Sequence, residues 1–308
     1  MMQAWTHPAC LLHDTGPGHA ERPERLRAVL DALHAAFPAL QWHEAPRATR
    51  GQLLRVHTPE LLSTVLDTNP TQRVHLDADT VLSPASAEAA LRAAGAAVAA
   101  TDAVLHGQAD RAFCAVRPPG HHATGDVAMG FCLFNSAAVA AAHAIAHGNL
   151  ERVAVIDFDV HHGNGTQAIF EHDPRVLYLS SHQSPLYPDS GYVEERGEGN
   201  IFNAPLQPGA GSDAFRAAWR ERLLPALEDF RPQLVIVSAG FDAHWRDPLA
   251  QLQLQADDYA WVTLELAKVA GRHAGGRMVS MLEGGYDLQA LAECSVAHVA
   301  ALSGLEPA

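Results

Sequence analysis

One nonapeptide, residues 157–165, concentrates side chains that bind metals. It reads Asp-Phe-Asp-Val-His-His-Gly-Asn-Gly and follows the apolar run 153–156, whose β-branched residues predict a buried parallel strand. Alternate side chains of an extended chain share a face, so Asp157, Asp159 and His161 are expected to point the same way. Two carboxylates and an imidazole suit a divalent metal such as zinc. The nonapeptide therefore predicts a metal site, and a polar turn with capping aspartates is the alternative.

Asp242 is the predicted third ligand. It comes just after another apolar run, 234–237, much as Asp159 follows its own strand. Three protein ligands leave open positions for water and substrate, which a catalytic site requires. A metal ion lowers the pKa of bound water from about 15.7 to about 7, which creates a nucleophile at neutral pH. Taken alone, Asp242 would be interpreted as a loop cap.

His121 and His122 follow the sequence Pro-Pro-Gly and form the predicted proton relay. An imidazole has a reference pKa near 6.5, so it can take a proton from water and deliver it to a leaving amine. Such a relay needs orienting partners, and Asp157 and Asn164 are the candidates. The alternative is a pair of surface histidines.

Tyr286 follows two glycines after an apolar run, and these glycines permit a tight turn that aims the phenol inward. A phenol O–H can stabilise a tetrahedral oxyanion. The pairs Gly130-Phe131 and Leu186-Tyr187 are candidates for the aromatic walls of a narrow channel. Ordinary core packing is the alternative for each of these aromatic residues.

Apolar strands and amphipathic helices alternate along the chain and predict a parallel α/β sheet in one domain, residues 1–308. The expected strands are 112–116, 153–156, 176–179, 234–237 and 278–282. The expected helices are 24–36, 49–55, 59–67, an Ala-rich helix capped by Ser83-Pro84, 134–147, 212–230, 256–272 and 287–302. Each strand ends in a polar loop, and ligands of open α/β sheets bind beyond the carboxyl ends of strands. The five loops are therefore expected to converge.

Composition excludes several classes of protein. The 308 residues carry a net charge of −14, which argues against nucleic-acid binding because phosphate contacts need clustered Lys and Arg. Four widely spaced cysteines form no C-x-x-C pair, so reduced thiols in a cytoplasmic protein are expected. The N-terminus lacks the features of a signal peptide, and charges within 85–105 favour a soluble helix over a membrane span.

In this order, the motifs resemble those of the histone deacetylase and acetylpolyamine amidohydrolase superfamily. The likeness runs from about Arg22 to His298 and rests on residues 117–122, 130–135, 157–165, 239–242 and 283–286. Asn164, where class I members usually carry Asp, makes the chain similar to the class II-like bacterial branch, the histone deacetylase-like amidohydrolases. The resemblance implies the arginase/deacetylase fold, with a central eight-stranded parallel sheet and helices on both faces.

The resemblance also implies the roles of residues. One catalytic zinc ion would be held by Asp159, His161 and Asp242. His122 would be the general base and acid, oriented by Asn164, beside His121 held by Asp157. Tyr286 would polarise the acyl carbonyl. The implied substrate contacts are Gly130, Phe131, Tyr187, Leu249, Gly284 and Asp77, and Arg25 would lie beside an acetate exit.

One or two structural potassium ions are implied as well. The first site would use Asp157, Asp159, His161, Ser180 and Ser181. The second would use Phe170, Asp173, Val176 and Asn200. Both sites rely on backbone carbonyls. Because every residue has one, the identity of the residues is a poor test of these sites.

One segment departs from the family pattern. Where many relatives read Pro-Gly-Thr-Gly, this chain reads Pro-Asp-Ser-Gly at 188–191. The carboxylate of Asp189 near the channel mouth, with further acidic residues after it, would favour a cationic substrate.

These observations predict a zinc-dependent deacetylase that hydrolyses the amide of an N-acetyl amine to acetate and free amine. Acyl-lysine in protein is the expected substrate, and acetylated polyamine is the alternative. A catalytically inactive acyl-lysine binding module has no reason to keep Tyr286 and the histidine pair. An arginase-type ureohydrolase would need a second set of carboxylates for a dinuclear site. The alanine-rich composition is typical of a GC-rich bacterial genome, and no membrane partner is expected.

Overall fold

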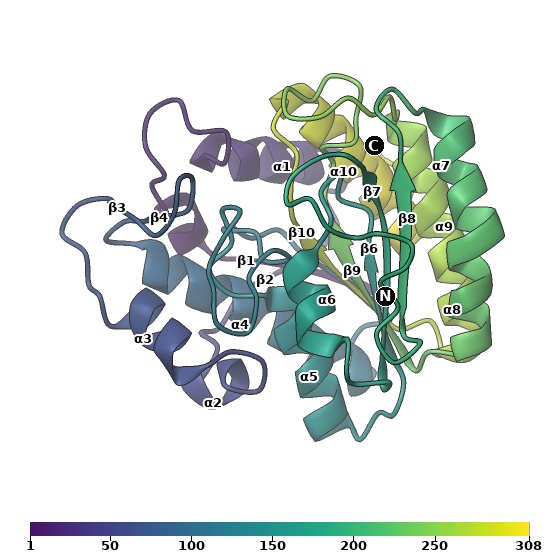
Figure 1. Cartoon of the computed structure of the whole chain (residues 1–308), viewed down its shortest axis with the longest axis horizontal. Helices are drawn as coiled ribbons and strands as arrows, with labels where there is room; N and C mark the ends of the chain where they lie inside the picture. Colours follow the sequence, from purple (N-terminus) through teal and green to yellow (C-terminus); the bar gives the residue numbers. More distant parts are fainter. Residues whose placement is uncertain (308) are drawn as a thin grey trace.

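Eight parallel strands form the central sheet of this computed structural model, which describes residues 1–307 (Figure 1). In spatial order they are β2 (Gln41–Glu44), β1 (Met2–Thr6), β5 (Arg111–Cys114), β10 (Met278–Leu282), β9 (Leu234–Ala239), β6 (Val153–Asp157), β7 (Val176–Gln183) and β8 (Ile201–Leu206). Every neighbouring pair is parallel. Strands β6, β9 and β10 are buried along their whole length, as expected for strands covered on both faces. The predicted α/β fold with an eight-stranded parallel sheet is confirmed.

Helices cover both faces of the sheet (Figure 1). One layer comprises α1 (Pro23–Ala36), α7 (Ser212–Ala218), α8 (Leu224–Phe230), α9 (Ala256–His273) and α10 (Leu288–Ser303). The other comprises α4 (Ser86–Leu105), α5 (Ser136–Gly148) and α6 (Asn164–Phe170), with α2 (Arg50–Leu53) and α3 (Pro59–Leu66) outside them. The small side chains of α4 and α5 let these two helices pack closely against each other and against the sheet.

Several local predictions need correction. Residues 180–183, expected as a loop, continue β7, because they pair with β8. The Ala-rich helix begins at Ser86, one turn after the expected cap at Ser83-Pro84. The helix expected at 212–230 contains a π-helical turn, Trp219–Leu223, between α7 and α8. A short hairpin of β3 (Val74–His75) and β4 (Val81–Leu82) was not expected.

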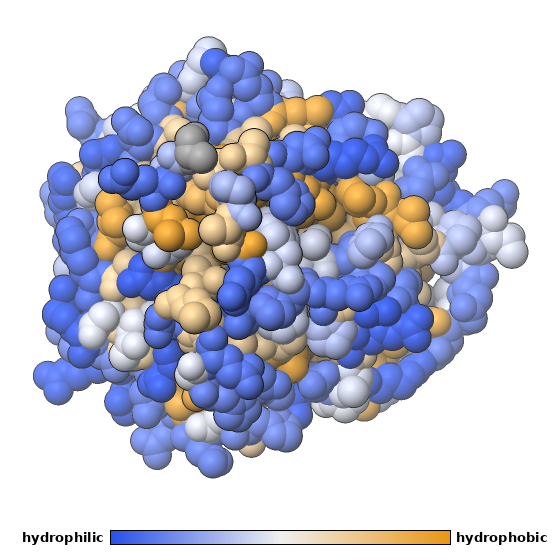
Figure 2. Space-filling model, turned by 180° about the vertical axis from the view of Figure 1, so that it is seen from behind, coloured by the Kyte–Doolittle hydropathy of each residue, from blue (hydrophilic) through white to orange (hydrophobic). Residues whose placement is uncertain are grey.

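The cysteines are reduced, as their spacing in the sequence predicted. All four cysteines are free and buried. Hydrophilic side chains border the face shown in Figure 2, and apolar ones lie between them. Among the described residues, no helix combines the length and the apolar character that crossing a bilayer requires.

His298 on α10 is fully buried and joins two helices to the sheet. Its Nδ1 lies 2.7 Å from the Thr263 hydroxyl of α9, and its Nε2 lies 2.8 Å from the Ser280 hydroxyl of β10. Burial lowers the pKa of His298 to about 3, so the folded protein holds this imidazole neutral. An unfolded chain takes up the proton near pH 6.5. The stability that neutral His298 contributes is therefore complete above pH 6.5 and is lost as the pH falls toward 3.

We expect His298→Gln, which cannot take up this proton, to flatten the acid dependence of stability. Between pH 6 and 4, the free energy of unfolding should fall less steeply than in the wild type, by about 1.4 kcal/mol per pH unit. Urea melts at several pH values measure this slope. The exposed His172→Gln is the matched control. Parallel slopes for wild type and His298→Gln would show that His298 does not govern the acid response.

Candidate active site

The loops after four neighbouring strands, β5, β10, β9 and β6, meet at the carboxyl edge in the middle of the sheet. The loop after β5 carries His121 and His122, and the loop after β6 carries Asp159 and His161. The loops after β9 and β10 carry Asp242 and Tyr286. Because parallel strands end at the same edge, these distant segments come together as the sequence predicts.

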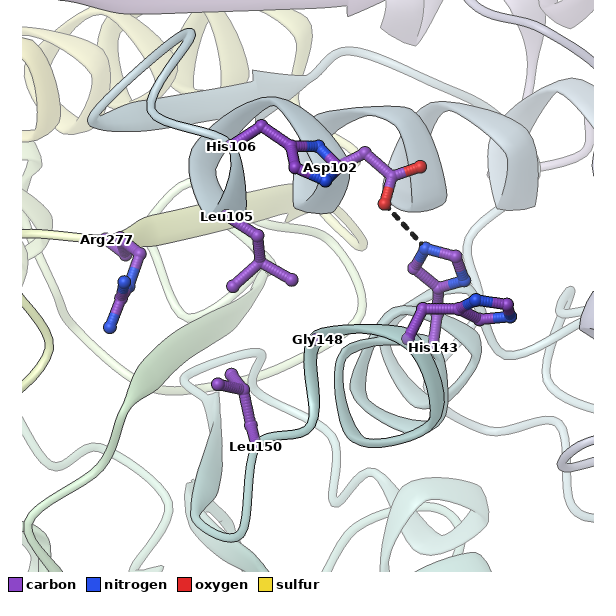
Figure 3. Close-up of a pocket in the computed structure, with 8 residues that line it drawn as sticks. Asp102, Leu105, His106, His143, Gly148, Leu150 and Arg277 are labelled. Atoms are coloured by element: carbon purple, nitrogen blue, oxygen red, sulfur yellow. Dashed lines mark hydrogen bonds and ion pairs between the residues drawn. The ribbon is translucent and has the colours of Figure 1, made fainter.

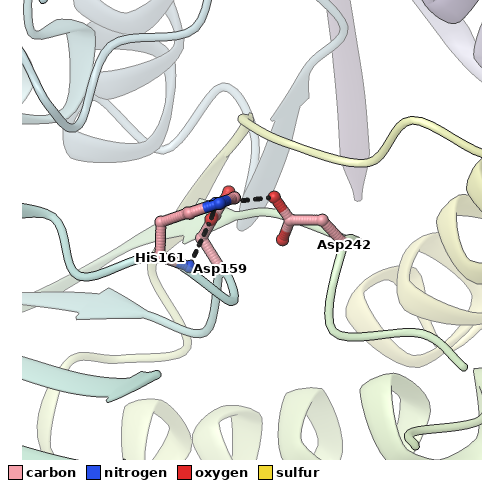
Figure 4. Close-up of side chains that lie close together, drawn as sticks. All are labelled: Asp159, His161 and Asp242. Atoms are coloured by element: carbon pink, nitrogen blue, oxygen red, sulfur yellow. Dashed lines mark hydrogen bonds and ion pairs between the residues drawn. The ribbon is translucent and has the colours of Figure 1, made fainter. Parts of the chain in front are cut away.

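Asp159, His161 and Asp242 form one buried cluster (Figure 4). One ligand atom from each lies within 4.8 Å of the others. The His161 Nδ1 lies 3.1 Å from Asp159 Oδ1 and 3.2 Å from Asp242 Oδ2. Backbone N–H groups fix the carboxylates, since Val160 donates to Asp242 and Gly284 donates to Asp159.

The charge of the cluster and the space beside it both suit a divalent cation. Two buried carboxylates carry more negative charge than one imidazole can offset, and buried charges need a partner. A side chain at position 284 would place its Cβ 2.1 Å from Asp242 Oδ2, so glycine keeps this side of the cluster open. Within residues 1–307, this is the one group of His, Cys, Asp or Glu side chains found close enough together to hold a metal. The second carboxylate set of a dinuclear site is therefore not seen there.

The two histidines have the partners that the sequence suggested. His121 Nδ1 lies 2.9 Å from Asp157 Oδ2, and His122 Nδ1 lies 2.8 Å from Asn164 Oδ1. Burial disfavours a charge on His121, but Asp157 and Asp159 outweigh it and raise its pKa well above 6.5. Burial, with His121 and His161 nearby, lowers the pKa of His122 well below 6.5. The pair therefore combines a cationic imidazole with a neutral one.

The tautomer of His122 follows from its partner. An amide oxygen can only accept a hydrogen bond, so His122 Nδ1 carries the hydrogen and donates it to Asn164. Its Nε2 then has a free lone pair and can accept a proton. His122 lines the same cavity as His161 and Tyr286. Gly130 lies against this imidazole, because a Cβ there would come within 2.5 Å of His122 Cδ2.

Tyr286 is 8% exposed and lies over Arg25. The Arg25 guanidinium carbon is 4.8 Å from the ring centroid, and its nitrogens donate to the carbonyls of Glu283 and Gly285, each at 2.5 Å. The Tyr286 N–H donates to Asp247 Oδ2 at 2.8 Å. Burial raises the pKa of the phenol well above 10, although Arg25 acts in the opposite direction. The phenol therefore stays protonated and able to donate.

A cavity of about 250 Å³ leads to these groups. Its lining residues are Asp79, His122, Gly130, Phe131, His161, Leu186, Tyr187, Leu249 and Tyr286. Apolar and aromatic side chains dominate the walls, as the sequence predicted for Phe131 and Tyr187. The Phe131 ring packs edge-on against Tyr286, with ring centroids 5.8 Å apart. A lining of this kind suits a largely apolar chain.

The acidic residues near the channel differ in position. Asp79 lines the cavity, whereas Asp77 Oδ1 accepts the N–H groups of Asp79 and Thr80 within its own turn. Asp189 is not among the lining residues, and its Oδ1 accepts the Tyr192 hydroxyl at 3.0 Å. Gly284 lies beneath the cavity against the Asp159 and Asp242 carboxylates. Asp79 is therefore the carboxylate of the cavity lining, and the predicted contact of Asp77 with substrate stays a prediction.

The two expected potassium sites differ in their geometry. At the second, the Asn200 amide nitrogen is 2.8 Å from Phe170 O, 2.8 Å from Val176 O and 3.1 Å from Asp173 O. At the first, the Ser180 hydroxyl contacts His182 Nδ1 and the Ser181 hydroxyl accepts from Trp219. Neighbouring strand residues point to opposite faces, so at most one of these two hydroxyls can face a common centre, and the other serine could contribute only its backbone carbonyl.

A second cavity, of about 500 Å³, lies away from this site between the ends of α4 and α5 (Figure 3). His143 Nε2 lies 2.7 Å from Asp102 Oδ1, and Arg55 donates to His143 Nδ1 at 3.0 Å. The Arg55 donor requires the His143 hydrogen to be on Nε2, directed at Asp102. Both ring nitrogens are therefore occupied, and neither is free to bind a metal.

Sequence reasoning assigned no role to Glu283 or Asp247, although both are buried beside the site. Glu283 belongs to the quoted motif 283–286, and a carboxylate directly after an apolar strand was the signal that could have identified it. Asp247 accepts the N–H groups of Tyr286 and Leu249. Nothing in its sequence context distinguishes it from an ordinary loop aspartate.

Comparisons with known proteins agree with this geometry. Residues 19–302 match the histone deacetylase domain family. A histone deacetylase-like amidohydrolase of Pseudomonas aeruginosa is 44% identical over 97% of this chain and 85% of its own length. The human polyamine deacetylase HDAC10 is 39% identical over 97% of this chain but 46% of its own length. The crystal structure of the HDA15 HD domain superposes with a TM-score of 0.94 at 36% identity, covering 100% of this chain and 90% of that one. The chain therefore belongs to the histone deacetylase family of amidohydrolases.

Proposed function

We propose that this protein is a zinc-dependent deacetylase that hydrolyses the acetyl amide of lysine side chains in proteins. The observation that carries the proposal is the hydrogen bond from His122 Nδ1 to Asn164, which leaves Nε2 free on an imidazole that lines one cavity with His161 and Tyr286. A proton acceptor, a cation-binding cluster and a phenol donor around one channel are the groups that amide hydrolysis needs.

Asp159, His161 and Asp242 would hold the zinc ion, which when bound activates water and polarises an acyl carbonyl. His122 Nε2 takes the proton from the attacking water and passes it to the departing amine. His121, held by Asp157, supports this transfer with its positive charge. The Tyr286 hydroxyl donates to the acyl oxygen as negative charge develops there. Asn164 keeps His122 in the required tautomer, although an amide cannot offset an imidazolium charge as a carboxylate would.

The apolar walls favour the aliphatic part of an acyl-lysine side chain. Leu186 and Leu249 line the channel with Phe131 and Tyr187, and Asp79 is the single carboxylate in the lining. Acetylated polyamine is the second candidate, because Asp79 can meet a cationic amine and because the human relative is named a polyamine deacetylase. A catalytically inactive binding module remains disfavoured, since both histidines keep their orienting partners.

A structural potassium ion near Asn200 belongs to the same proposal. Three carbonyl oxygens converge on the Asn200 amide nitrogen, but an NH₂ group has only two hydrogens to donate. A cation bound beside these carbonyl oxygens would satisfy the one that receives no hydrogen from the amide. The first site, near Ser180, would rely on backbone carbonyls, because its two serine hydroxyls diverge.

Amine release from two substrates tests the function. An acetyl-lysine peptide and an acetylated polyamine are incubated with the protein, with and without a chelator. We expect peptide turnover that the chelator abolishes and that added zinc restores. Turnover of the polyamine alone would instead identify a polyamine deacetylase, and Asp79→Asn and Asp189→Asn would then show which carboxylate selects the cation. No turnover by a zinc-loaded protein would contradict the proposal for acetyl substrates.

A further inference from the structure

The Glu283 side chain lies beneath the loop that carries the two histidines. Glu283 follows β10 directly and is 1% exposed. Its Oε2 accepts the Gly120 N–H at 2.6 Å and the His121 N–H at 3.2 Å. Its Oε1 accepts the Ser238 hydroxyl at 3.1 Å, at the end of β9. One side chain thus connects the carboxyl ends of three neighbouring strands, β5, β10 and β9.

The backbone of Glu283 is held as firmly as its side chain. Its carbonyl accepts from Arg25 at 2.5 Å, and the next N–H, that of Gly284, donates to Asp159 Oδ2 at 2.9 Å. Glu283 therefore has a fixed position relative to the metal-binding cluster. A loop that hydrogen-bonds to its side chain is thereby tied to that cluster.

The loop that receives these bonds has little freedom elsewhere. A Cβ at position 120 would lie 2.8 Å from Ser136 N and 2.9 Å from Phe134 O, so the backbone packs directly against the start of α5. The Gly120 and His121 N–H groups are buried, and Glu283 provides the acceptor for both. Buried N–H groups require a partner, so loss of this acceptor would move the loop. His121 and His122 would move with it.

We propose that Glu283 is a positioning residue for the histidine pair, whose side-chain oxygen places His122 relative to the metal-binding cluster and Tyr286. This inference rests on the proposed deacetylase function. It assigns Glu283 a geometric role, in which the hydrogen bonds to Gly120 and His121 matter and the negative charge does not. Burial raises the pKa of Glu283 to about 7, although His121 and the Gly120 N–H favour the ionised form.

Two substitutions separate geometry from charge. Glu283→Gln removes the charge, yet its amide oxygen can accept both N–H groups while its nitrogen donates to Ser238. Glu283→Asp keeps the charge but is shorter by one methylene and cannot reach all three partners. We expect Glu283→Gln to keep kcat within a few-fold of wild type. We expect Glu283→Asp to lose on the order of 10²-fold in kcat with little change in KM, because small misplacements of catalytic groups cost about that much.

Hydrogen exchange of the peptide spanning residues 117–124 supplies a readout that does not depend on activity. We expect faster exchange in Glu283→Asp than in the wild type and near wild-type exchange in Glu283→Gln. Glu265→Ala on α9, which removes a partly exposed partner of Lys268, is the control.

Two results would overturn the inference. Wild-type kcat and exchange in Glu283→Asp would show that the loop does not depend on these bonds. Loss of kcat in Glu283→Gln with retention in Glu283→Asp would show that charge, not position, is the contribution. If the wild type itself turns over no acetyl substrate, the proposed function fails, and the exchange data still decide whether Glu283 holds the loop.

Discussion

Tyr286→Phe is expected to keep its metal and to lose most of its turnover. The phenol hydroxyl is the one atom removed, and the cavity, the Arg25 contact and the N–H bond to Asp247 do not depend on it. In the proposed reaction this hydroxyl donates to the acyl oxygen as it becomes negative. One oxyanion donor is typically worth about 10²–10³ in kcat. Amine release under saturating substrate measures the loss, and elemental analysis measures the bound metal.

The control for this change is Tyr192→Phe. Tyr192 is 45% exposed, and its hydroxyl donates to Asp189 outside the cavity lining. The same chemical change there should leave kcat near the wild-type value. Wild-type turnover in Tyr286→Phe would remove Tyr286 from the mechanism. Loss of metal together with turnover would show that the substitution acts on the cluster instead.

Asp242→Ala is expected to abolish both metal retention and turnover. It removes one of three proposed ligands and leaves Asp159 and His161, which are too few to hold zinc tightly. It also deprives the buried Val160 N–H of its acceptor, so the loop after β6 loses an anchor. Purified protein should contain much less than one metal ion per chain by elemental analysis. Added zinc should not restore turnover at concentrations that restore the chelator-treated wild type.

Asp229→Ala, an exposed change on α8, controls for loss of a carboxylate as such. It should bind metal and turn over substrate as the wild type does. A melting curve of each variant separates loss of metal from loss of fold. Full zinc occupancy in Asp242→Ala would refute the assignment of this ligand.

The central strands could be predicted from the sequence because each contains a short run that is mostly apolar. Strands β6, β9 and β10 are buried throughout, and β6 and β9 are also rich in β-branched residues. Strands β1, β2 and β8 carry no such signal. β2 is exposed at both ends and half-buried between them, and β8 includes a proline, so their pairing depends on tertiary contacts. The full count of eight strands came only from the resemblance to a known family.

The residues of the site also differ in whether their roles could be predicted from the sequence. Asp157 and Asn164 could be named as histidine partners because they lie just before and just after the proposed ligands Asp159 and His161, and the structure places both within 2.9 Å of the two imidazoles. The hydrogen bonds of Glu283 could not be read from the sequence. They join residues 163 and 162 positions apart, and no periodic pattern records such a distance. The position of Asp79 in the cavity lining likewise could not be distinguished from that of Asp77, two residues away in the same loop.

The order of strands has a consequence for synthesis on the ribosome. β5 and β6 are made early, but the two strands that lie between them, β9 and β10, belong to the last third of the chain. About 125 residues separate the end of β6 from the end of β10, which at roughly 5–20 residues per second is a delay of about 6–25 s. During that interval the nascent chain presents apolar strands with unpaired edges, which are templates for aggregation. We therefore expect protection of the nascent chain by chaperones to matter for this protein until its C-terminal third has emerged.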